Sequence, residues 1–120
     1  MKTVLIIAAA LALPGAAPAA DITGAWKVDS SVGTTPISIN CNLVQAGGKL
    51  TGDCAPATGD AGPTALTGTV DGAKAQWGYD VTFRGQPAHV GYEADIKSDS
   101  AMTGVLTLSG KPSPFTAAKK

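Results

Sequence analysis

The fold of this chain can be predicted from one stretch, AKAQWGYDVTFRGQPAHVGYEADI at residues 73–96. Alternate residues of this stretch are apolar on both sides of a central Arg-Gly-Gln-Pro, residues 84–87. A period of two predicts β-strands, because successive strand side chains point to opposite faces of a sheet. The residues predicted to face inward are Ala73, Ala75, Trp77, Tyr79, Val81, Phe83, Ala88, Val90, Tyr92, Ala94 and Ile96. The stretch therefore predicts an antiparallel hairpin, with residues 84–87 as its loop.

The four-residue loop also sets the predicted register of this hairpin. It places Phe83 opposite Ala88, and therefore Trp77 opposite Ala94. Both pairs keep the apolar residues on one face, and near the tryptophan they set a large residue against a small one. This agreement between alternation and loop length favours the hairpin over any other arrangement of the stretch.

The same alternation recurs along the rest of the chain after residue 20. The predicted strands lie at residues 22–28, 37–43, 49–55, 65–70, 73–84, 88–96, 102–108 and around 115–117. Gly47-Gly48 and Asp71-Gly72 are two-residue turns of the types that match strand twist, and the second pairs Val70 with Ala73. The segments predicted as loops are Asp29–Pro36, Ala55–Thr64 and Ser109–Pro114.

Eight antiparallel strands with mostly short connections predict an all-β fold. We expect a small up-and-down eight-stranded β-barrel, because closure removes exposed strand edges. A β-sandwich is the alternative. The disulfide of an immunoglobulin-type sandwich joins opposite sheets, whereas the two cysteines here fall within one hairpin. The cysteine positions therefore favour the barrel.

The cysteine pair gives the sharpest local prediction. A Gly47-Gly48 turn pairs Ala46 with Lys49, and the same register places Cys41 directly opposite Cys54. Counted outward from the hydrogen-bonded Ala46–Lys49 pair, Cys41 and Cys54 form a non-hydrogen-bonded pair. The Cα atoms of such a pair lie about 4.5 Å apart, a distance that a disulfide accepts. We therefore expect a Cys41–Cys54 cross-strand disulfide rather than a metal or redox dithiol, since no Cys-x-x-Cys spacing is present.

The first 19 residues have the features of a secretory signal peptide. Lys2 precedes an apolar run that is too short to span a bilayer, and Ala17-Pro18-Ala19 fits the cleavage site. Cleavage would leave a single domain of residues 20–120 in the periplasm or outside the cell, where disulfides form. Loss of Lys2 changes 9 basic against 9 acidic residues to 8 against 9, a net charge of −1. We therefore expect neither a nucleic-acid partner nor a membrane-spanning segment.

Few residues of this chain could take part in catalysis. The chain has a single histidine, His89, and lacks a nucleophile elbow, a P-loop and a dinucleotide fingerprint. The predicted register places Asp80 opposite Gly91 on the outer face, with His89 and Glu93 as its diagonal neighbours. Such an exposed group of charges is usually solvated and contributes little. We expect no enzymatic activity, no catalytic residue, no metal site and no cofactor.

Small residues alternate with aromatic ones on the predicted inner face. The inward small residues are Gly24, Gly52, Gly68, Ala75, Ala94 and Gly104. Beside them lie Trp77, Tyr79 and Tyr92, which we take as the candidate ligand-binding residues because aromatic rings offer apolar area with polar tips. The expected function is to bind a small apolar ligand in the barrel or at its mouth. The competing interpretation is that the rings fill a packed core and the glycines let a narrow barrel coil.

Gly24-Ala25-Trp26-Lys27 resembles the Gly-x-Trp of the lipocalin-like (calycin) group of eight-stranded barrels. That resemblance implies structural roles for Gly24 and Trp26, with a basic residue from the last strand, Lys119 or Lys120, packed over the tryptophan. The Leu-Thr-Gly copies, such as residues 50–52, also resemble avidin-type barrels. Biotin binding does not follow, because Cys54 stands where that family has a tyrosine. As a whole the chain resembles small secreted bacterial domains that generally have no assigned function.

A protein-binding module is the alternative function. The signal, the early Gly-x-Trp and the single disulfide resemble the periplasmic barrels that inhibit secreted metalloproteases. Those inhibitors insert an N-terminal trunk into the protease, and here only Ala20 and Asp21 precede the first predicted strand. The three predicted loops could instead carry recognition on a rigid scaffold, as loops often do.

Overall fold

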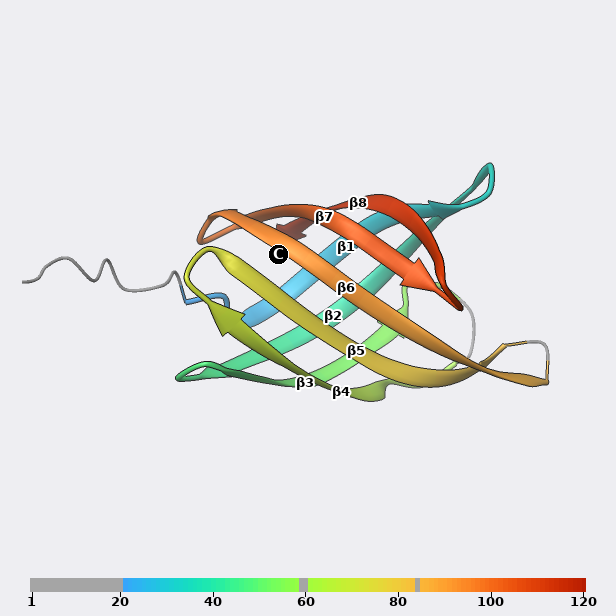
Figure 1. Ribbon diagram of the computed structural model, residues 1–120, viewed down its shortest axis with the longest axis horizontal. Helices are drawn as coiled ribbons and strands as arrows, with labels where there is room; N and C mark the ends of the chain where they lie inside the picture. Colours follow the sequence, from blue (N-terminus) through green and yellow to red (C-terminus); the bar gives the residue numbers. More distant parts are fainter. Residues whose placement is uncertain (1–20, 59–60, 84) are drawn as a thin grey trace, which may run out of the picture.

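The computed structural model describes residues 21–58, 61–83 and 85–120 of the chain. The strands are β1 (Gly24–Val32), β2 (Thr35–Ala46), β3 (Lys49–Pro56), β4 (Thr64–Asp71), β5 (Lys74–Phe83), β6 (Gln86–Ser98), β7 (Ala101–Leu108) and β8 (Lys111–Lys119). Figure 1 shows the strands wrapped around one long axis, with the beginning of β1 toward the left end. The predicted signal peptide lies outside the described residues.

The eight strands form one closed antiparallel barrel. Each strand pairs with the next in sequence, and β8 pairs back with β1. Closure rests on a short ladder that runs from Trp26 opposite Lys119 to Asp29 opposite Thr116. The predicted up-and-down barrel is therefore confirmed, and the sandwich alternative is wrong. Closure is possible because every strand has one apolar face, which can bury only toward a common axis.

The inward positions of all eight strands build a single apolar core. No polar or charged residue that the structure describes is among the buried ones. The buried residues are Ile22, Trp26, Val28, Cys41, Leu43, Leu50, Cys54, Leu66, Val70, Ala75, Trp77, Tyr79, Val90, Tyr92, Ala94, Met102, Leu106, Phe115 and Ala117. Their spacing along each strand is two, so the predicted inner face is the observed one.

Inward glycines let neighbouring backbones approach closely. A Cβ atom on Gly52 would lie 1.8 Å from the carbonyl oxygen of Asn42, and one on Gly68 would lie 1.9 Å from that of Gln76. A Cβ atom on Gly104 would meet a β6 carbonyl oxygen at 1.9 Å. Only glycine fits these three positions, which end the stretches Leu50-Thr51-Gly52, Leu66-Thr67-Gly68 and Met102-Thr103-Gly104.

The disulfide prediction is confirmed. Cys41 and Cys54 are bonded across β2 and β3, with their Cα atoms 4.0 Å apart. The Gly47-Gly48 turn has the expected register, with Ala46 opposite Lys49. Both cysteines point into the core and are almost fully buried. The bond thus fastens two strands of the wall from inside the barrel.

The predicted register between β4 and β5 was wrong by two residues. The turn lies at Gly72-Ala73, one residue later than expected, and Val70 is opposite Ala75. Gly72 adopts a positive φ of 61°, which glycine tolerates without strain. The shift sets Gly68 opposite Trp77. A residue without a side chain thus lies beside the largest ring, where the close backbone approach excludes any Cβ atom.

The predicted register between β5 and β6 was also wrong by two residues. A two-residue turn replaces the four-residue loop, so Phe83 is opposite Gln86. Trp77 consequently faces Tyr92 instead of Ala94. The expectation of large residues against small ones fails here, because stacked aromatic rings fill the space across the ladder. A shift of two leaves every side chain on its predicted face.

Two of the three predicted loops are mostly strand. β1 and β2 continue to a tight turn at residues 33–34, and β7 and β8 continue to one at residues 109–110. Only the segment between β3 and β4 is a longer connection, from residue 57 to 63, of which 59 and 60 lie outside the described residues. The Pro, Ser and Thr residues that suggested loops therefore lie mostly in paired strands.

Candidate functional site

One end of the barrel is plugged. This closed end carries the turns after β2, β4 and β6, and the chain enters there. Ile22 and Trp26 are fully buried, and the Trp26 indole donates a 2.8 Å hydrogen bond from Nε1 to the Ile22 carbonyl oxygen. Lys119 Nζ lies 5.5 Å from the centroid of the Trp26 ring. The expected basic residue over the tryptophan is thus Lys119, in a cation–π arrangement.

The other end, which we call the mouth, is less deeply buried. It carries the turns after β1, β5 and β7 and the connection between β3 and β4. Its inward side chains are apolar but only partly buried, and those of Ile39, Val81 and Leu108 pack against the core from the solvent side. Apolar side chains at the mouth therefore stay partly exposed to solvent. Ile22 and Trp26, which we call the plug, are by contrast fully buried.

Two hairpins extend beyond the body of the barrel at the mouth (Figure 1). β1 pairs with β8 only as far as Asp29, although its ladder with β2 continues to Val32. β5 pairs with β4 only as far as Gly78, although its ladder with β6 continues to Phe83. The ends of these two hairpins are therefore two-stranded ribbons that project on either side of the mouth.

The three predicted ligand-binding residues come together inside the barrel. Trp77 and Tyr92 stack with ring centroids 4.8 Å apart, and Phe115 packs edge-on against both. Tyr79 lies one inward position closer to the mouth, and its hydroxyl oxygen is 2.7 Å from that of Tyr92. We call these four residues the aromatic cluster.

Burial shapes the acid–base behaviour of the two tyrosines. Desolvation raises the pKa of Tyr92, and the neighbouring Tyr79 raises it further. Burial also raises the pKa of Tyr79, while its hydrogen bond with Tyr92 acts in the opposite direction. Both phenols are therefore neutral at ordinary pH, so that one donates and the other accepts within the pair.

Trp77 carries the one buried side-chain nitrogen or oxygen atom without a partner in the described part of the chain. Its Nε1 has no hydrogen-bond partner, although the residue is only 3 % exposed. An unpaired buried donor costs about 1–3 kcal/mol. Tryptophan Nε1 usually finds an acceptor when buried, so the Trp77 ring is held by its packing contacts without a hydrogen bond of its own.

The structure also brings together a site that the sequence did not predict. Asp80 lies directly opposite His89, and His89 Nδ1 is 2.8 Å from an Asp80 carboxylate oxygen. The predicted register had made them diagonal neighbours. On the same outer face, Gly78 is paired with Gly91, and these two glycines leave a groove of about 410 Å³. Because the predicted register between β5 and β6 was wrong by two residues, the sequence did not predict this groove.

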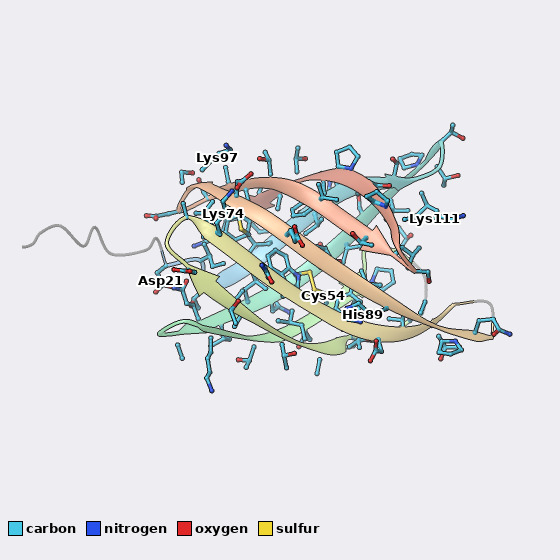
Figure 2. The ribbon with its side chains drawn as sticks, in the orientation of Figure 1. Asp21, Cys54, Lys74, His89, Lys97 and Lys111 are labelled. Atoms are coloured by element: carbon cyan, nitrogen blue, oxygen red, sulfur yellow. A yellow bond between two sulfur atoms is a disulfide. The ribbon has the colours of Figure 1, made fainter. Side chains whose placement is uncertain are left out.

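The other charged contacts lie near the closed end. Lys74 forms an ion pair with Asp95, which lowers the pKa of that carboxyl group. Asp21 accepts a hydrogen bond from the backbone N–H of Thr23, and this bond is the main reason that the pKa of Asp21 is lowered. Figure 2 shows Asp21, Lys74 and Lys97 toward that end, with His89 and Lys111 farther along the barrel. These surface pairs contribute little to stability.

Residues 21–58, 61–83 and 85–120 contain no group of three or more His, Cys, Asp or Glu residues that could hold a metal ion. The same residues include no helix of the length and apolarity needed to cross a membrane. The candidate sites of this chain are therefore the mouth with its aromatic cluster, and the groove beside His89.

Comparisons with protein-family models, curated proteins and solved structures find no match to this chain. Its function is therefore argued from the geometry above.

Proposed function

We propose that this protein is a small exported binding barrel that takes an apolar ligand at its mouth. The observation that carries the proposal is the difference in burial between the two ends. The closed end buries Ile22 and Trp26 completely and leaves Ile96 partly exposed, whereas Ile39, Val81 and Leu108 at the mouth all keep part of their apolar surface exposed. A ligand that covered this surface would gain about 25 cal/mol for each Å² removed from water.

The aromatic cluster would form the floor of this site. A ligand that enters from the mouth would reach Tyr79 before Tyr92 and Trp77, because Tyr79 is the inward residue nearer that end. The tyrosine hydroxyl pair offers a polar point at the base of an otherwise apolar surface. Small pockets commonly combine apolar walls with a few placed polar groups in this way.

Two further features support export and a calycin-like relationship. A buried disulfide agrees with an oxidising compartment. The Gly24-x-Trp26 pattern, the plug and Lys119 over the ring agree with the lipocalin-like arrangement that the sequence resembles. That relationship would make ligand binding at the end opposite Trp26 the natural use of the fold.

Binding can be tested with N-phenyl-1-naphthylamine, a neutral apolar dye that fluoresces when it leaves water. The wild-type protein should enhance its fluorescence, and Val81→Asn at the mouth should weaken that effect at least fivefold. Val44→Asn is the matched control, since Val44 is an exposed valine on the outer face of β2. Equal binding by both variants, or none by the folded wild type, would overturn the proposal.

A protein-binding module is the second candidate, and the projecting hairpins favour it. Val32 at the end of β1 is one of the few large exposed apolar residues in the described chain. An inhibitor or envelope factor would hold its partner between the two ribbons. Affinity capture from the host envelope should then recover one partner with wild type and lose it with Val32→Asp. Recovery of the same proteins by both would argue against this function.

A further inference from the structure

The groove beside His89 has its floor on the outer surface of four strands. Thr67, Gly78, Gly91 and Thr107 lie side by side across β4, β5, β6 and β7, since each is the ladder partner of the next. The two central residues lack side chains, so the sheet surface is hollow between the two threonines. The hollow is built by the strand registers, and it lies on the outer surface of the barrel, on the opposite face of the sheet from the aromatic cluster.

Polar side chains lie at both ends of the groove. His89, the partner of Asp80, lines one end, and Gln76 and Glu93 form the pair at the other. His89 and Glu93 are four residues apart on β6, which corresponds to about 13 Å at 3.3 Å per strand residue. The His89 imidazole takes up part of this span, because it lies over Gly78.

His89 is held in place over this floor. Its Nδ1 bonds to Asp80, so in the neutral ring Nε2 is left as the free acceptor. A Cβ atom on Gly78 would lie 3.1 Å from His89 Nε2, and one on Gly91 would lie 3.8 Å from it. The imidazole edge therefore reaches over the glycine floor, where a ligand would meet it.

The lining selects the chemistry of the ligand. Threonine hydroxyls, the Gln76 amide, the Glu93 carboxylate and the His89 ring provide many acceptors and several donors within a small area. Among the described residues that line the groove none is lysine or arginine, so an anionic ligand would meet only the negative charge of Glu93, with that of Asp80 close by. Trp77 and Tyr92 also line the groove, but both are almost fully buried and offer little apolar surface to a lipid.

We infer that this groove binds one ring of an uncharged saccharide. The C–H face of the ring lies against Gly91, beside the His89 imidazole that lies over Gly78. The ring hydroxyls then exchange hydrogen bonds with Gln76, Glu93 and His89 at the two ends. The site is open, so binding is weak, on the order of 1 mM.

The two floor glycines differ in a way that gives a sharp test. A Cβ atom on Gly78 would meet the Val90 carbonyl oxygen at 2.9 Å, so substitution there strains the sheet. At Gly91 the nearest atoms to a new Cβ are those of the exposed His89 ring, at 3.8 and 3.9 Å. Gly91→Ala and Gly91→Thr therefore fill the groove and leave the barrel intact. Gly62→Ala is the control, because nothing lies within 4 Å of a Cβ at that position.

The experiment is titration of ¹⁵N-labelled protein with cellotriose, with trigalacturonate as the anionic probe. Cellotriose at millimolar concentrations should shift the backbone amide signals of Gly78, Gly91 and His89 in wild type and in Gly62→Ala. Gly91→Ala should reduce the affinity at least threefold, and Gly91→Thr should abolish it. Val81→Asn at the mouth should leave the titration unchanged, which separates this site from the proposed apolar one.

Three results would overturn the inference. The first is a folded wild-type protein whose groove amide signals do not move with cellotriose. The second is a Gly91→Thr variant that keeps the wild-type affinity. The third is trigalacturonate binding as strongly as cellotriose, because the negative lining cannot favour an anion.

Discussion

The two tryptophans of this chain occupy the same kind of inward position, and their surroundings differ. Trp26, in the plug, donates a hydrogen bond to the Ile22 carbonyl and lies under Lys119. Trp77, in the aromatic cluster, is held by stacking on Tyr92 and by an edge contact with Phe115, and its Nε1 has no partner. One ring is fixed by directional bonds, and the other by shape alone.

This difference distinguishes the half of the barrel around Trp26 from the half around Trp77. Trp26 also lies directly opposite Cys41 in the ladder, so the disulfide belongs to its surroundings. Regions that are held by packing without polar restraint open more easily than fully bonded ones. Rearrangement at the mouth would therefore change the surroundings of Trp77 and leave those of Trp26 as they are.

Phenylalanine at each position tests the comparison most strongly. Trp26→Phe should lower the free energy of unfolding by about 3–4 kcal/mol, because it removes ring volume and leaves the buried Ile22 carbonyl without its donor. Trp77→Phe should cost about 1 kcal/mol or less, because the loss of volume is offset by removal of an unpaired donor. Urea unfolding measures both values, and equal losses would show that the two sites do not differ as described.

Removal of the disulfide is expected to have the next largest effect. The double variant Cys41→Ala/Cys54→Ala should lose about 3 kcal/mol of unfolding free energy on the loop-entropy model. The indole N–H signal of Trp26 should shift in its NMR spectrum, since Trp26 is the ladder neighbour of Cys41. A shift confined to the Trp77 signal would contradict the assignment of the disulfide to the Trp26 half.

Alkaline pH should act through the aromatic cluster. Burial raises the pKa of both Tyr79 and Tyr92 above the value of 10.0 that a free tyrosine has. The unfolded chain therefore loses protons first, so their contribution to stability is complete below pH 10 and is lost as pH rises above it.

The double variant Tyr79→Phe/Tyr92→Phe leaves no hydroxyl unpaired and should cost about 1 kcal/mol near neutral pH. Its unfolding free energy should fall less steeply above pH 10 than that of wild type, as urea titrations at a series of pH values would show. Equal slopes would mean that the two phenols ionise as freely in the barrel as in the unfolded chain.

Lys119 provides the smallest test. Lys119→Met keeps most of the aliphatic stem over the Trp26 ring and removes the charge, so it should cost about 0.5–1 kcal/mol. Lys119→Arg should retain most of the stability, because a guanidinium also packs on an aromatic face. Thermal unfolding of the two variants would distinguish loss of the Lys119 charge from loss of its packing contact with the Trp26 ring. A Met variant as stable as wild type would show that only the stem matters.

The sequence by itself predicted the strands, their inner faces and the disulfide, and these predictions share one cause. An alternation of two assigns every residue of a strand to a face, whatever its partner. The Gly47-Gly48 turn then left only one plausible register between β2 and β3, which placed Cys41 opposite Cys54. At Gly47-Gly48 local chemistry was enough to set the pairing of a hairpin, whereas the same kind of signal at Asp71-Gly72 lay one residue away from the observed turn.

The tertiary structure alone decided the registers on both sides of β5, and with them the groove. A slip of two residues moves no side chain to the other face, so the apolar pattern cannot distinguish the two registers. Contacts across the barrel do distinguish them, because Gly68 lies beside Trp77 and Trp77 stacks on Tyr92. The pairings of Asp80 with His89 and of Gly78 with Gly91 follow from that choice. The fold was thus determined by a local periodicity, whereas the candidate sites depend on which large side chains fit together at the axis.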